Sequence, residues 1–201
     1  MKKLAIMGSG NGGNFEAIVK YFKGKDIEIT CLSDIKDALI LKRAQNLGIK
    51  NQYLPFEKNL NYFSQNKFDL VALAGYMRIL SDEILNKMDS KIINIHPSLL
   101  PSFKGNTRAI KEAFLSGVKV SGVTIHWVDS SIDGGKIIAQ YPVFINNDNN
   151  FNDFKEKIHN LEHKLYPVVI EKILEDKVFD FQDLMKSNCS GGCNSCKRCV
   201  H

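Results

Sequence analysis

The sequence predicts an α/β fold: a doubly wound, mostly parallel sheet with an antiparallel hairpin near its C-terminal end. Three observations support this prediction. Short apolar runs alternate with segments of helical periodicity over residues 3–116. One run, FDLVALAG at 68–75, is continuously apolar after Asp69, which is typical of a central parallel strand covered on both faces. Two later runs, 120–128 and 136–144, are joined by a loop with paired glycines, as in a hairpin.

The N-terminal half is expected to consist of strand–helix units. The glycine-rich loop GSGNGGN at 8–14 separates the first strand from a helix with apolar residues at steps of three and four. Gly48 is a typical residue just after a helix end. The expected strands are 3–7, 27–33 and 50–54, and the expected helices start near Phe15 and span 37–47 and 58–66.

The C-terminal half continues the pattern with one more parallel strand, the hairpin and a long helix. Ser81 before two acidic residues indicates a helix N-terminus. Pro167 is expected to kink or interrupt the last helix. The expected elements are a helix at 81–88, a strand at 91–95, a helix at 107–116, and a helix with Phe151, Phe154, Ile158, Leu161, Leu165 and Val168 on one face.

Length and composition fit a single soluble domain, predicted at 1–185, followed by a Cys-rich tail at 186–201. The 201 residues carry 27 Lys+Arg against 22 Asp+Glu without a dense basic run, which favours a small anionic substrate or an ordinary solvated surface over nucleic acid. No apolar run approaches the roughly 20 residues of a membrane span. The first apolar run is too short for a signal peptide, so we expect a cytoplasmic protein without a membrane partner.

Four of the five cysteines lie in the tail, whereas a secreted disulfide scaffold would distribute them through the fold. Their C-x-x-C-x-x-C spacing in a reducing compartment suggests zinc or an iron–sulfur cluster. The alternative is a flexible tail with free thiols. The candidate ligands are Cys189, Cys193, Cys196 and Cys199.

Ligands of doubly wound sheets bind outside the carboxyl ends of the strands, which directs attention to the loops after residues 7, 75, 96 and 128. The loop at 8–14 provides free backbone N–H groups at a helix start, where phosphate binds. Its glycines at 8, 10 and 13 have the G-x-G-x-x-G spacing, but the loop lacks the Gly-Lys-Ser/Thr of a Walker loop, and a simple tight turn is the alternative.

The strand at 91–95 ends in a polar pair. Asn94 and His96 are two residues apart and therefore share one face of the strand. An amide beside an imidazole can stabilise an oxyanion and move a proton, although the pair could also simply close a strand. Asp133 lies in a Gly-flanked loop and could orient His96 and raise the pKa of His96. Alternatively, Asp133 could simply form a turn, because Asp-Gly is common in turns. Asp34 and Asp129 compete with it for an acid role.

Other polar residues support weaker hypotheses. Arg78 could hold a carboxylate or sit on a helix start. One of His126 and Trp127 is expected to face the core, and neither needs a function. His159 and His163 are four residues apart, as in some metal sites, but without an H-E-x-x-H pattern. No serine or cysteine makes a convincing nucleophile, and Cys31 is expected in the core.

Together, the motifs GNGGN, AGYMRIL, INIHPSLLPSFKG and GVTIHWVDSSIDGGKIIAQ resemble the folate-dependent formyltransferases, over roughly residues 1–175. The glycine loop and AGYMRIL are most similar to the members that formylate glycinamide ribonucleotide. The resemblance implies the formyltransferase fold with a Rossmann-like N-terminal half, and a monomer or homodimer. It implies 10-formyltetrahydrofolate as cosubstrate, direct attack of the ribonucleotide amine on the formyl carbon, and no need for a metal.

The resemblance also implies a role for each matching residue. The implied catalytic residues are Asn94, His96 and Asp133; the phosphate-binding residues are Gly12, Gly13 and Asn14; the ribonucleotide contacts are Gly75 and Glu162; the folate contacts are Met77, Arg78, Ile79 and Leu80. Three departures stand out: Gly13 replaces a frequent Ser, His159 replaces a familiar Gln, and the segment after Gly105 is about two residues short.

Four other functions share parts of this pattern. A formyltetrahydrofolate hydrolase has the same catalytic trio but usually carries an extra N-terminal domain. A methionyl-tRNA formyltransferase needs a C-terminal nucleic-acid-binding domain, for which the chain has too few residues after 175. A non-catalytic folate- or nucleotide-binding module would have no use for Asp133 beside His96. A nicotinamide-dependent dehydrogenase matches only the fold and the glycine spacing, without a clear acidic ribose anchor.

Overall fold

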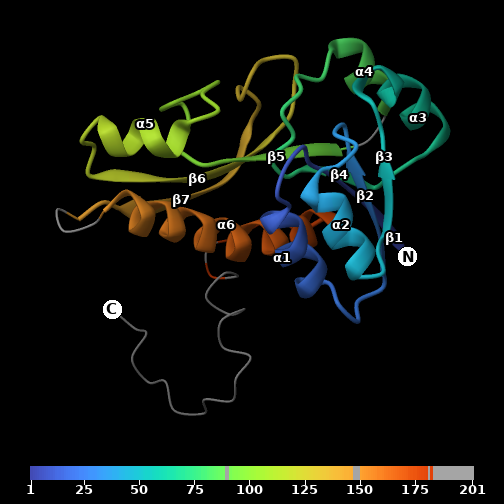
Figure 1. Ribbon diagram of the computed structural model, residues 1–201, viewed down its shortest axis with the longest axis horizontal. Helices are drawn as coiled ribbons and strands as arrows, with labels where there is room; N and C mark the ends of the chain where they lie inside the picture. Colours follow the sequence, from blue (N-terminus) through green and yellow to red (C-terminus); the bar gives the residue numbers. More distant parts are fainter. Residues whose placement is uncertain (89–90, 147–149, 181, 183–201) are drawn as a thin grey trace.

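One seven-stranded sheet forms the centre of the molecule (Figure 1). The computed structural model describes residues 1–88, 91–146, 150–180 and 182. The strand order is β3-β2-β1-β4-β5-β6-β7. The first five strands along this order are parallel to one another, and β6 pairs antiparallel with both β5 and β7. The strands are β1 (Lys2–Met7), β2 (Ile27–Ser33), β3 (Lys50–Tyr53), β4 (Leu70–Leu73), β5 (Lys91–His96), β6 (Val120–Trp127) and β7 (Ile137–Phe144).

Helices cover both faces of the sheet, because consecutive residues of the central strands are apolar and alternate between the two faces. In β1, Leu4 and Ile6 belong to one buried cluster with residues of α1, α2, α5 and α6, whereas Ala5 and Met7 belong to a second cluster with residues of α3 and α4. The helices are α1 (Gly13–Tyr21), α2 (Leu39–Asn46), α3 (Asn59–Gln65), α4 (Asp82–Met88), α5 (Ala109–Leu115) and α6 (Phe151–Leu174), with a short 3-10 turn at Phe56–Lys58.

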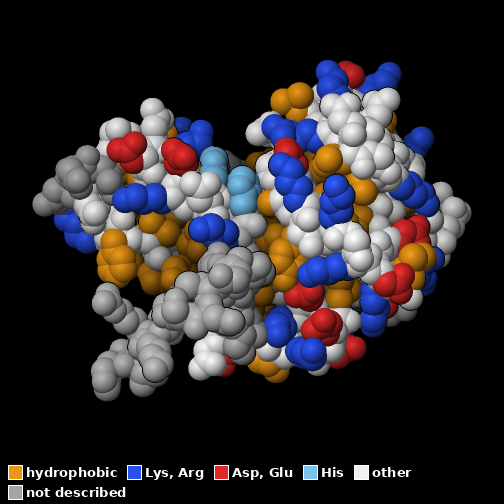
Figure 2. All heavy atoms as spheres, turned by 90° about the horizontal axis from the view of Figure 1, so that it is seen from below, with side chains coloured by type: hydrophobic (Ala, Val, Ile, Leu, Met, Phe, Trp, Pro, Cys, Tyr) orange, Lys and Arg blue, Asp and Glu red, His pale blue; other side chains and the backbone are white. Residues whose placement is uncertain are grey.

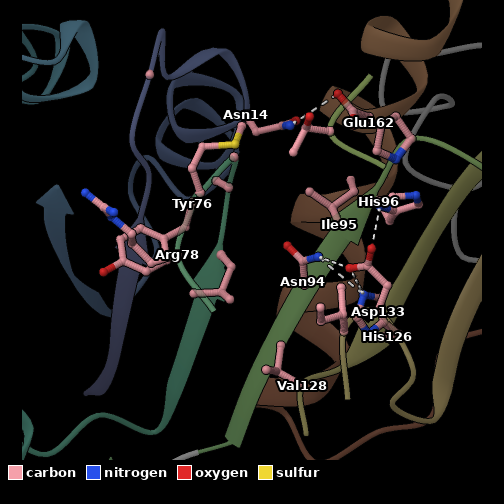
Figure 3. A pocket seen from close by; sticks show the side chains of 18 of the residues that line it. Asn14, Tyr76, Arg78, Asn94, Ile95, His96, His126, Val128, Asp133 and Glu162 are labelled. Atoms are coloured by element: carbon pink, nitrogen blue, oxygen red, sulfur yellow. Dashed lines mark hydrogen bonds and ion pairs between the residues drawn. The ribbon is translucent and has the colours of Figure 1, made fainter. Parts of the chain in front are cut away.

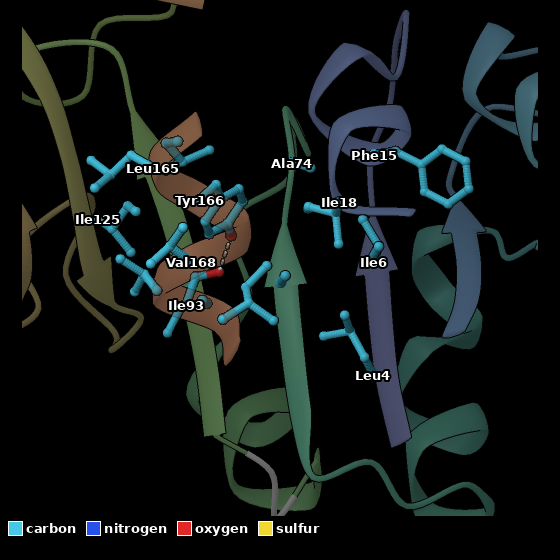
Figure 4. Close-up of a cluster of buried hydrophobic side chains, with 14 of the residues drawn as sticks. Leu4, Ile6, Phe15, Ile18, Ala74, Ile93, Ile125, Leu165, Tyr166 and Val168 are labelled. Carbon is cyan, nitrogen blue, oxygen red and sulfur yellow. Dashed lines mark hydrogen bonds between the residues drawn. The ribbon is translucent and has the colours of Figure 1, made fainter. Parts of the chain in front are cut away.

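Tyr166 fixes the long helix α6 to the middle of the sheet (Figure 4). Its ring is fully buried, and its hydroxyl lies 2.9 Å from the carbonyl oxygen of Leu73 and 3.2 Å from that of Ile93. A single hydroxyl proton thus faces acceptors on β4 and β5 together. This contact sets the position of α6 relative to the carboxyl ends of the two strands.

The structure confirms the predicted fold class and the hairpin of β6 and β7, with element ends that differ by a few residues. Ser81 caps α4, because the N–H of Ile84 donates to its hydroxyl oxygen at 3.4 Å. Of the predicted kink or interruption at Pro167, the interruption is wrong, since α6 continues through it to Leu174. Tyr166, Pro167 and Val168 are all buried, and this packing outweighs the roughly 3 kcal/mol cost of an internal proline.

The predicted tail at 186–201, with the four candidate metal ligands, lies outside the described residues. Within the described ranges, no helix is both long and apolar enough to cross a membrane.

Candidate active site

A cavity of about 600 Å³ opens at the carboxyl edge of the sheet, where the loops after β1, β4, β5 and β6 meet. The four described histidines, His96, His126, His159 and His163, all line it. Figure 2 shows histidine side chains beside a hollow on this face of the molecule. The cavity is therefore located where a doubly wound sheet binds its ligands, and it brings all twelve predicted site residues of the described chain together.

Asn94, His96 and Asp133 form one hydrogen-bonded cluster at the β5 end of the cavity (Figure 3). Nδ1 of His96 lies 3.3 Å from Oδ2 of Asp133, and Nδ2 of Asn94 donates to Oδ1 of the same carboxylate at 3.4 Å. The N–H of Gly105 also donates to Oδ2, at 2.9 Å. Strand alternation places the first two side chains together, and the loop after β6 adds the carboxylate.

His96 is buried, and its two ring nitrogens face acceptors. Nδ1 faces Asp133, and Nε2 lies 3.2 Å from the carbonyl oxygen of Phe103. Burial lowers the pKa of His96 below its usual 6.5, although both acceptors act in the opposite direction. Asp133 raises the pKa of His96, as the sequence-based prediction has it, but desolvation of the imidazolium is the larger effect and makes the net shift downward.

Asp133 stays ionised at neutral pH. A hydrogen bond with His126 is the largest of the effects that lower its pKa to about 2; the nearby His96 and the Gly105 N–H add to it, against the effect of partial burial. The residue has a φ of 48°, an uncommon left-handed conformation that aims its carboxylate back towards β5. The result is a fixed negative charge beside the imidazole.

His126 also lines the cavity, although sequence reasoning did not assign it to the site. It is buried on β6 directly opposite Asn94. Its Nε2 lies 3.3 Å from Nδ2 of Asn94 and 3.7 Å from Oδ1 of Asp133, while Nδ1 lies 2.8 Å from the carbonyl oxygen of Trp127. Only the register between β5 and β6 reveals this placement, because alternation alone did not say which of His126 and Trp127 faces inward.

The glycine loop forms the opposite end of the cavity. Gly12 has a φ of 80°, and a Cβ there would lie 2.9 Å from Ile40, so the loop requires glycine at this position. Helix α1 begins at Gly13, and the first N–H groups of a helix have no intrahelical acceptor. This end of the cavity can therefore bind an anion through backbone N–H groups.

Asn14 and Glu162 link the glycine loop to α6. Nδ2 of Asn14 donates to Oε2 of Glu162 at 3.3 Å, while the buried Oδ1 of Asn14 has no partner within the described residues. Burial raises the pKa of Glu162 to about 7, against the effect of this hydrogen bond. At this end the carboxyl group is thus partly neutral near pH 7.

His159 and His163 lie on the same side of α6 as Glu162. Burial lowers the pKa of both imidazoles. Nε2 of His163 lies 3.0 Å from where a Cβ on Gly13 would be, so the imidazole bounds the space that a serine would use. Among the described residues, no group of three His, Cys, Asp or Glu side chains is arranged to hold a metal ion.

The loop after β4 forms the remaining wall. Met77 and Ile79 are 64% and 62% exposed, although both are apolar, and Leu80 is buried. Gly75 adopts the left-handed conformation with a φ of 72°. Arg78 does hold a carboxylate, that of Asp34, at 2.9 Å. Exposed apolar side chains on a cavity wall are suited to a flat organic ligand.

The two competing acidic residues are occupied elsewhere. Asp34 pairs with Arg78 and is not part of the cavity wall. Asp129 accepts from the N–H and hydroxyl of Ser131 at 2.9 and 2.5 Å. In the described structure, Asp133 is the carboxylate in contact with His96.

Comparison with known proteins agrees with this geometry. A family model described as formyl transferase matches residues 2–170, so the chain belongs to the formyl transferase family. More particularly, the chain is 41% identical over 189 residues to the phosphoribosylglycinamide formyltransferase of Bacillus subtilis (strain 168), covering 87% of this chain and 95% of that protein.

Two solved structures are similar over nearly the same range. The phosphoribosylglycinamide formyltransferase from Streptococcus pneumoniae TIGR4 has a TM-score of 0.78 and 38% identity, covering 86% of this chain and 99% of that one. The one from Bacillus halodurans has a TM-score of 0.80 and 35% identity, and the match covers 89% of this chain and 100% of that one. The resemblance inferred from the motifs is thereby confirmed.

Proposed function

We propose that this chain is a phosphoribosylglycinamide formyltransferase, which transfers a formyl group from 10-formyltetrahydrofolate to the amine of glycinamide ribonucleotide in purine synthesis. The observation that carries the proposal is the Asn94–His96–Asp133 cluster facing a glycine loop across one cavity. The similarity to the Bacillus subtilis enzyme over 95% of its length supports the same activity.

The two ends of the cavity suit the two parts of the ribonucleotide. Its phosphate binds the backbone N–H groups of Gly12, Gly13 and Asn14. Gly75 and Glu162 contact its sugar and amide portion, since both line the space between that loop and His96. The folate binds along the β4 loop, where its ring system covers exposed apolar side chains; the residues of this wall are Met77, Arg78, Ile79 and Leu80.

The reaction needs no covalent enzyme intermediate. The amine nitrogen attacks the formyl carbon, and the carbonyl electron pair moves to oxygen to give a tetrahedral oxyanion. Neutral His96 takes a proton from the new ammonium centre, and the resulting imidazolium and the Asn94 amide stabilise the oxyanion. The oxyanion then collapses, the bond to folate N10 breaks, and that nitrogen receives the proton. Asp133 holds His96 and helps to pass the proton through water.

A formyltetrahydrofolate hydrolase is the nearest alternative, because water in place of the amine would use the same three residues. The discriminating experiment measures tetrahydrofolate formation from 10-formyltetrahydrofolate with and without glycinamide ribonucleotide. We expect turnover only with the ribonucleotide. Turnover at an equal rate without it identifies a hydrolase, and ligand binding without any turnover favours a non-catalytic binding module.

The Cys-rich tail remains a separate proposal, supported by the C-x-x-C-x-x-C spacing alone. Elemental analysis of the purified full chain and of a chain ending at Lys186 tests it. We expect zinc or iron in the full chain and none in the shortened one, whereas no metal in either rules out the site.

A further inference from the structure

A partly buried side-chain network, centred on Asp34, joins the ends of three parallel strands beside the cavity. Ser9 follows β1, Asp34 follows β2, and Arg78 belongs to the loop after β4. The hydroxyl of Ser9 donates to Oδ1 of Asp34 at 2.6 Å, and Nε of Arg78 donates to Oδ2 at 2.9 Å. Both carboxylate oxygens of Asp34 are therefore occupied, each by a residue from a different loop.

The two partners of Asp34 differ in exposure. The carboxylate side chain is 1% exposed, whereas the Arg78 side chain is 53% exposed. A buried carboxylate needs charge compensation and hydrogen bonds, so losing either partner is costly. Arg78 is thus held in one orientation at the cavity wall by a group that is itself fixed in the protein interior.

Ser9 extends the network to the backbone of the β4 loop. Its hydroxyl oxygen accepts from the N–H of Met77 at 2.9 Å while its proton is donated to Asp34. The N–H of Ser9 donates to the carbonyl oxygen of Gly75 at 3.0 Å. The start of the glycine loop and the β4 loop are consequently connected by two hydrogen bonds, one of which depends on the orientation that Asp34 gives to the Ser9 hydroxyl.

Neither Ser9 nor Asp34 lines the cavity, yet the residues on either side of the network do. Gly10–Asn14 form the proposed phosphate end, and Gly75–Leu80 form the proposed folate wall. A change in the orientation of the Ser9 hydroxyl or of Arg78 therefore alters the positions of residues in both walls, while every side chain that lines the cavity is retained.

We propose that Asp34 is a positioning residue that fixes the β4 loop against the glycine loop through Arg78 and Ser9, and so sets the affinity for both substrates. The inference rests on the proposed formyl transfer. It assigns Asp34 no contact with either substrate and no part in the proton transfer.

The first test compares KM and kcat for wild type, Asp34→Ala and Asp34→Asn in the full chain. We expect Asp34→Ala to raise KM for 10-formyltetrahydrofolate about tenfold and KM for the ribonucleotide several-fold, with kcat changed less than about threefold. Asp34→Asn keeps an acceptor for Ser9 but loses the charge facing Arg78, so its KM values are expected between those of wild type and Asp34→Ala.

Asp69→Ala is the matched control. The Asp69 carboxylate also connects parallel strands, because it accepts from the N–H of Lys3 at 2.7 Å, but it does so at the opposite edge of the sheet. We expect both KM values of this variant to equal those of wild type. An equal rise in KM for Asp69→Ala, or unchanged KM values in Asp34→Ala, overturns the proposal.

A double-mutant cycle with Ser9→Ala separates positioning from a general loss of stability. Because both residues act through one network, Ser9→Ala/Asp34→Ala is expected to raise KM no more than the larger single change. Additive effects contradict a shared network. Loss of thermal stability with unchanged KM values indicates a merely structural role.

Hydrogen exchange gives a readout that does not depend on catalysis. The Met77 amide is bonded to Ser9, so Asp34→Ala is expected to accelerate exchange in segment 75–80 at least tenfold relative to the amides of β1. Unchanged exchange in this segment overturns the inference even if wild type shows no formyl transfer. An inactive wild type with accelerated exchange in the variant instead counts against the proposed function alone.

Discussion

Two carboxyl groups occupy opposite ends of the same cavity, and their environments move their pKa values in opposite directions. The pKa of Asp133 is lowered to about 2, while that of Glu162 is raised to about 7. Asp133 is partly buried and faces two imidazoles and a backbone N–H. Glu162 is more deeply buried and accepts one long hydrogen bond, from Asn14. Donors, rather than residue type, decide which end of the cavity carries a fixed charge.

This difference separates two tasks within the proposed site. The Asp133 end has its polar groups paired before any ligand arrives, which suits a cluster that must orient an imidazole. The Glu162 end has a buried oxygen of Asn14 without a partner among the described residues and a carboxyl group that titrates near neutral pH. A bound ligand can supply hydrogen-bond partners for these groups, so this end of the cavity is suited to substrate binding.

Replacing the charged carboxylate has the largest expected effect. Asp133→Asn keeps the shape of the side chain but removes the charge that holds His96, so kcat is expected to fall about 10²–10⁴-fold. Steady-state formyl transfer measures this. Asp129→Asn, which changes a carboxylate on the same loop that contacts Ser131 instead, is expected to retain most activity. Equal losses in both variants contradict a special role for Asp133.

A change at the glycine loop is expected to act on substrate binding. Gly12→Ala forces a side chain into a left-handed residue and against Ile40, so KM for the ribonucleotide is expected to rise about tenfold. Gly24→Ala is the matched control, because Gly24 has a φ of 82° but nothing within 4 Å of its added Cβ. Both variants lower Tm; a KM change in the control counts against a binding role for the loop.

The neutral end is expected to reveal itself in the pH dependence of stability. The pKa of Glu162 is about 7 in the folded chain and near 4.5 when unfolded, so the folded state binds the extra proton between these values. The associated stability is fully present below pH 4.5 and is lost as pH rises through about 7. Glu162→Gln removes this loss. The Tm difference between Glu162→Gln and wild type is therefore expected to shift in favour of the variant by about 7–14 °C between pH 4.5 and pH 8. A pH-independent difference contradicts the raised pKa.

The smallest expected effect concerns the acidic limb of kcat/KM. If neutral His96 accepts a proton, kcat/KM rises with pH through the His96 pKa, which burial places below 6.5. In Asp133→Asn, the rise of the residual kcat/KM with pH is expected at still lower pH, because the carboxylate that favours the imidazolium is gone. A limb that moves upward in this variant contradicts the assigned electrostatics.

Local patterns were sufficient to predict the fold and the loops that meet at the site, whereas the family resemblance supplied residues such as Glu162. Alternation along β5 placed Asn94 beside His96, and the strand–helix order indicated which loops meet. Pattern reasoning failed where several segments pack together. Proline chemistry alone predicted a kink or an interruption at Pro167, but the helix is not interrupted, because its buried neighbours hold it in place.

Charge states and cross-strand contacts were beyond sequence reasoning for the same reason. The lowered pKa of His96 depends on burial by several elements, and sequence proximity gave only the opposing effect of Asp133. The place of His126 opposite Asn94 follows from strand register, which no local pattern fixes. Asp34 was a candidate acid in the sequence, and only the structure pairs it with Arg78 and Ser9.

The opposite charge states of the two carboxyl groups can be observed directly by ¹³C NMR. Side-chain carboxyl carbons of labelled Asp and Glu are titrated, with Asp133→Asn and Glu162→Gln assigning the two signals. We expect Asp133 to be ionised and Glu162 protonated at pH 5, with Glu162 titrating near pH 7. Two carboxyl groups that are both ionised at pH 5 would contradict the division of the cavity into a charged end and a neutral end.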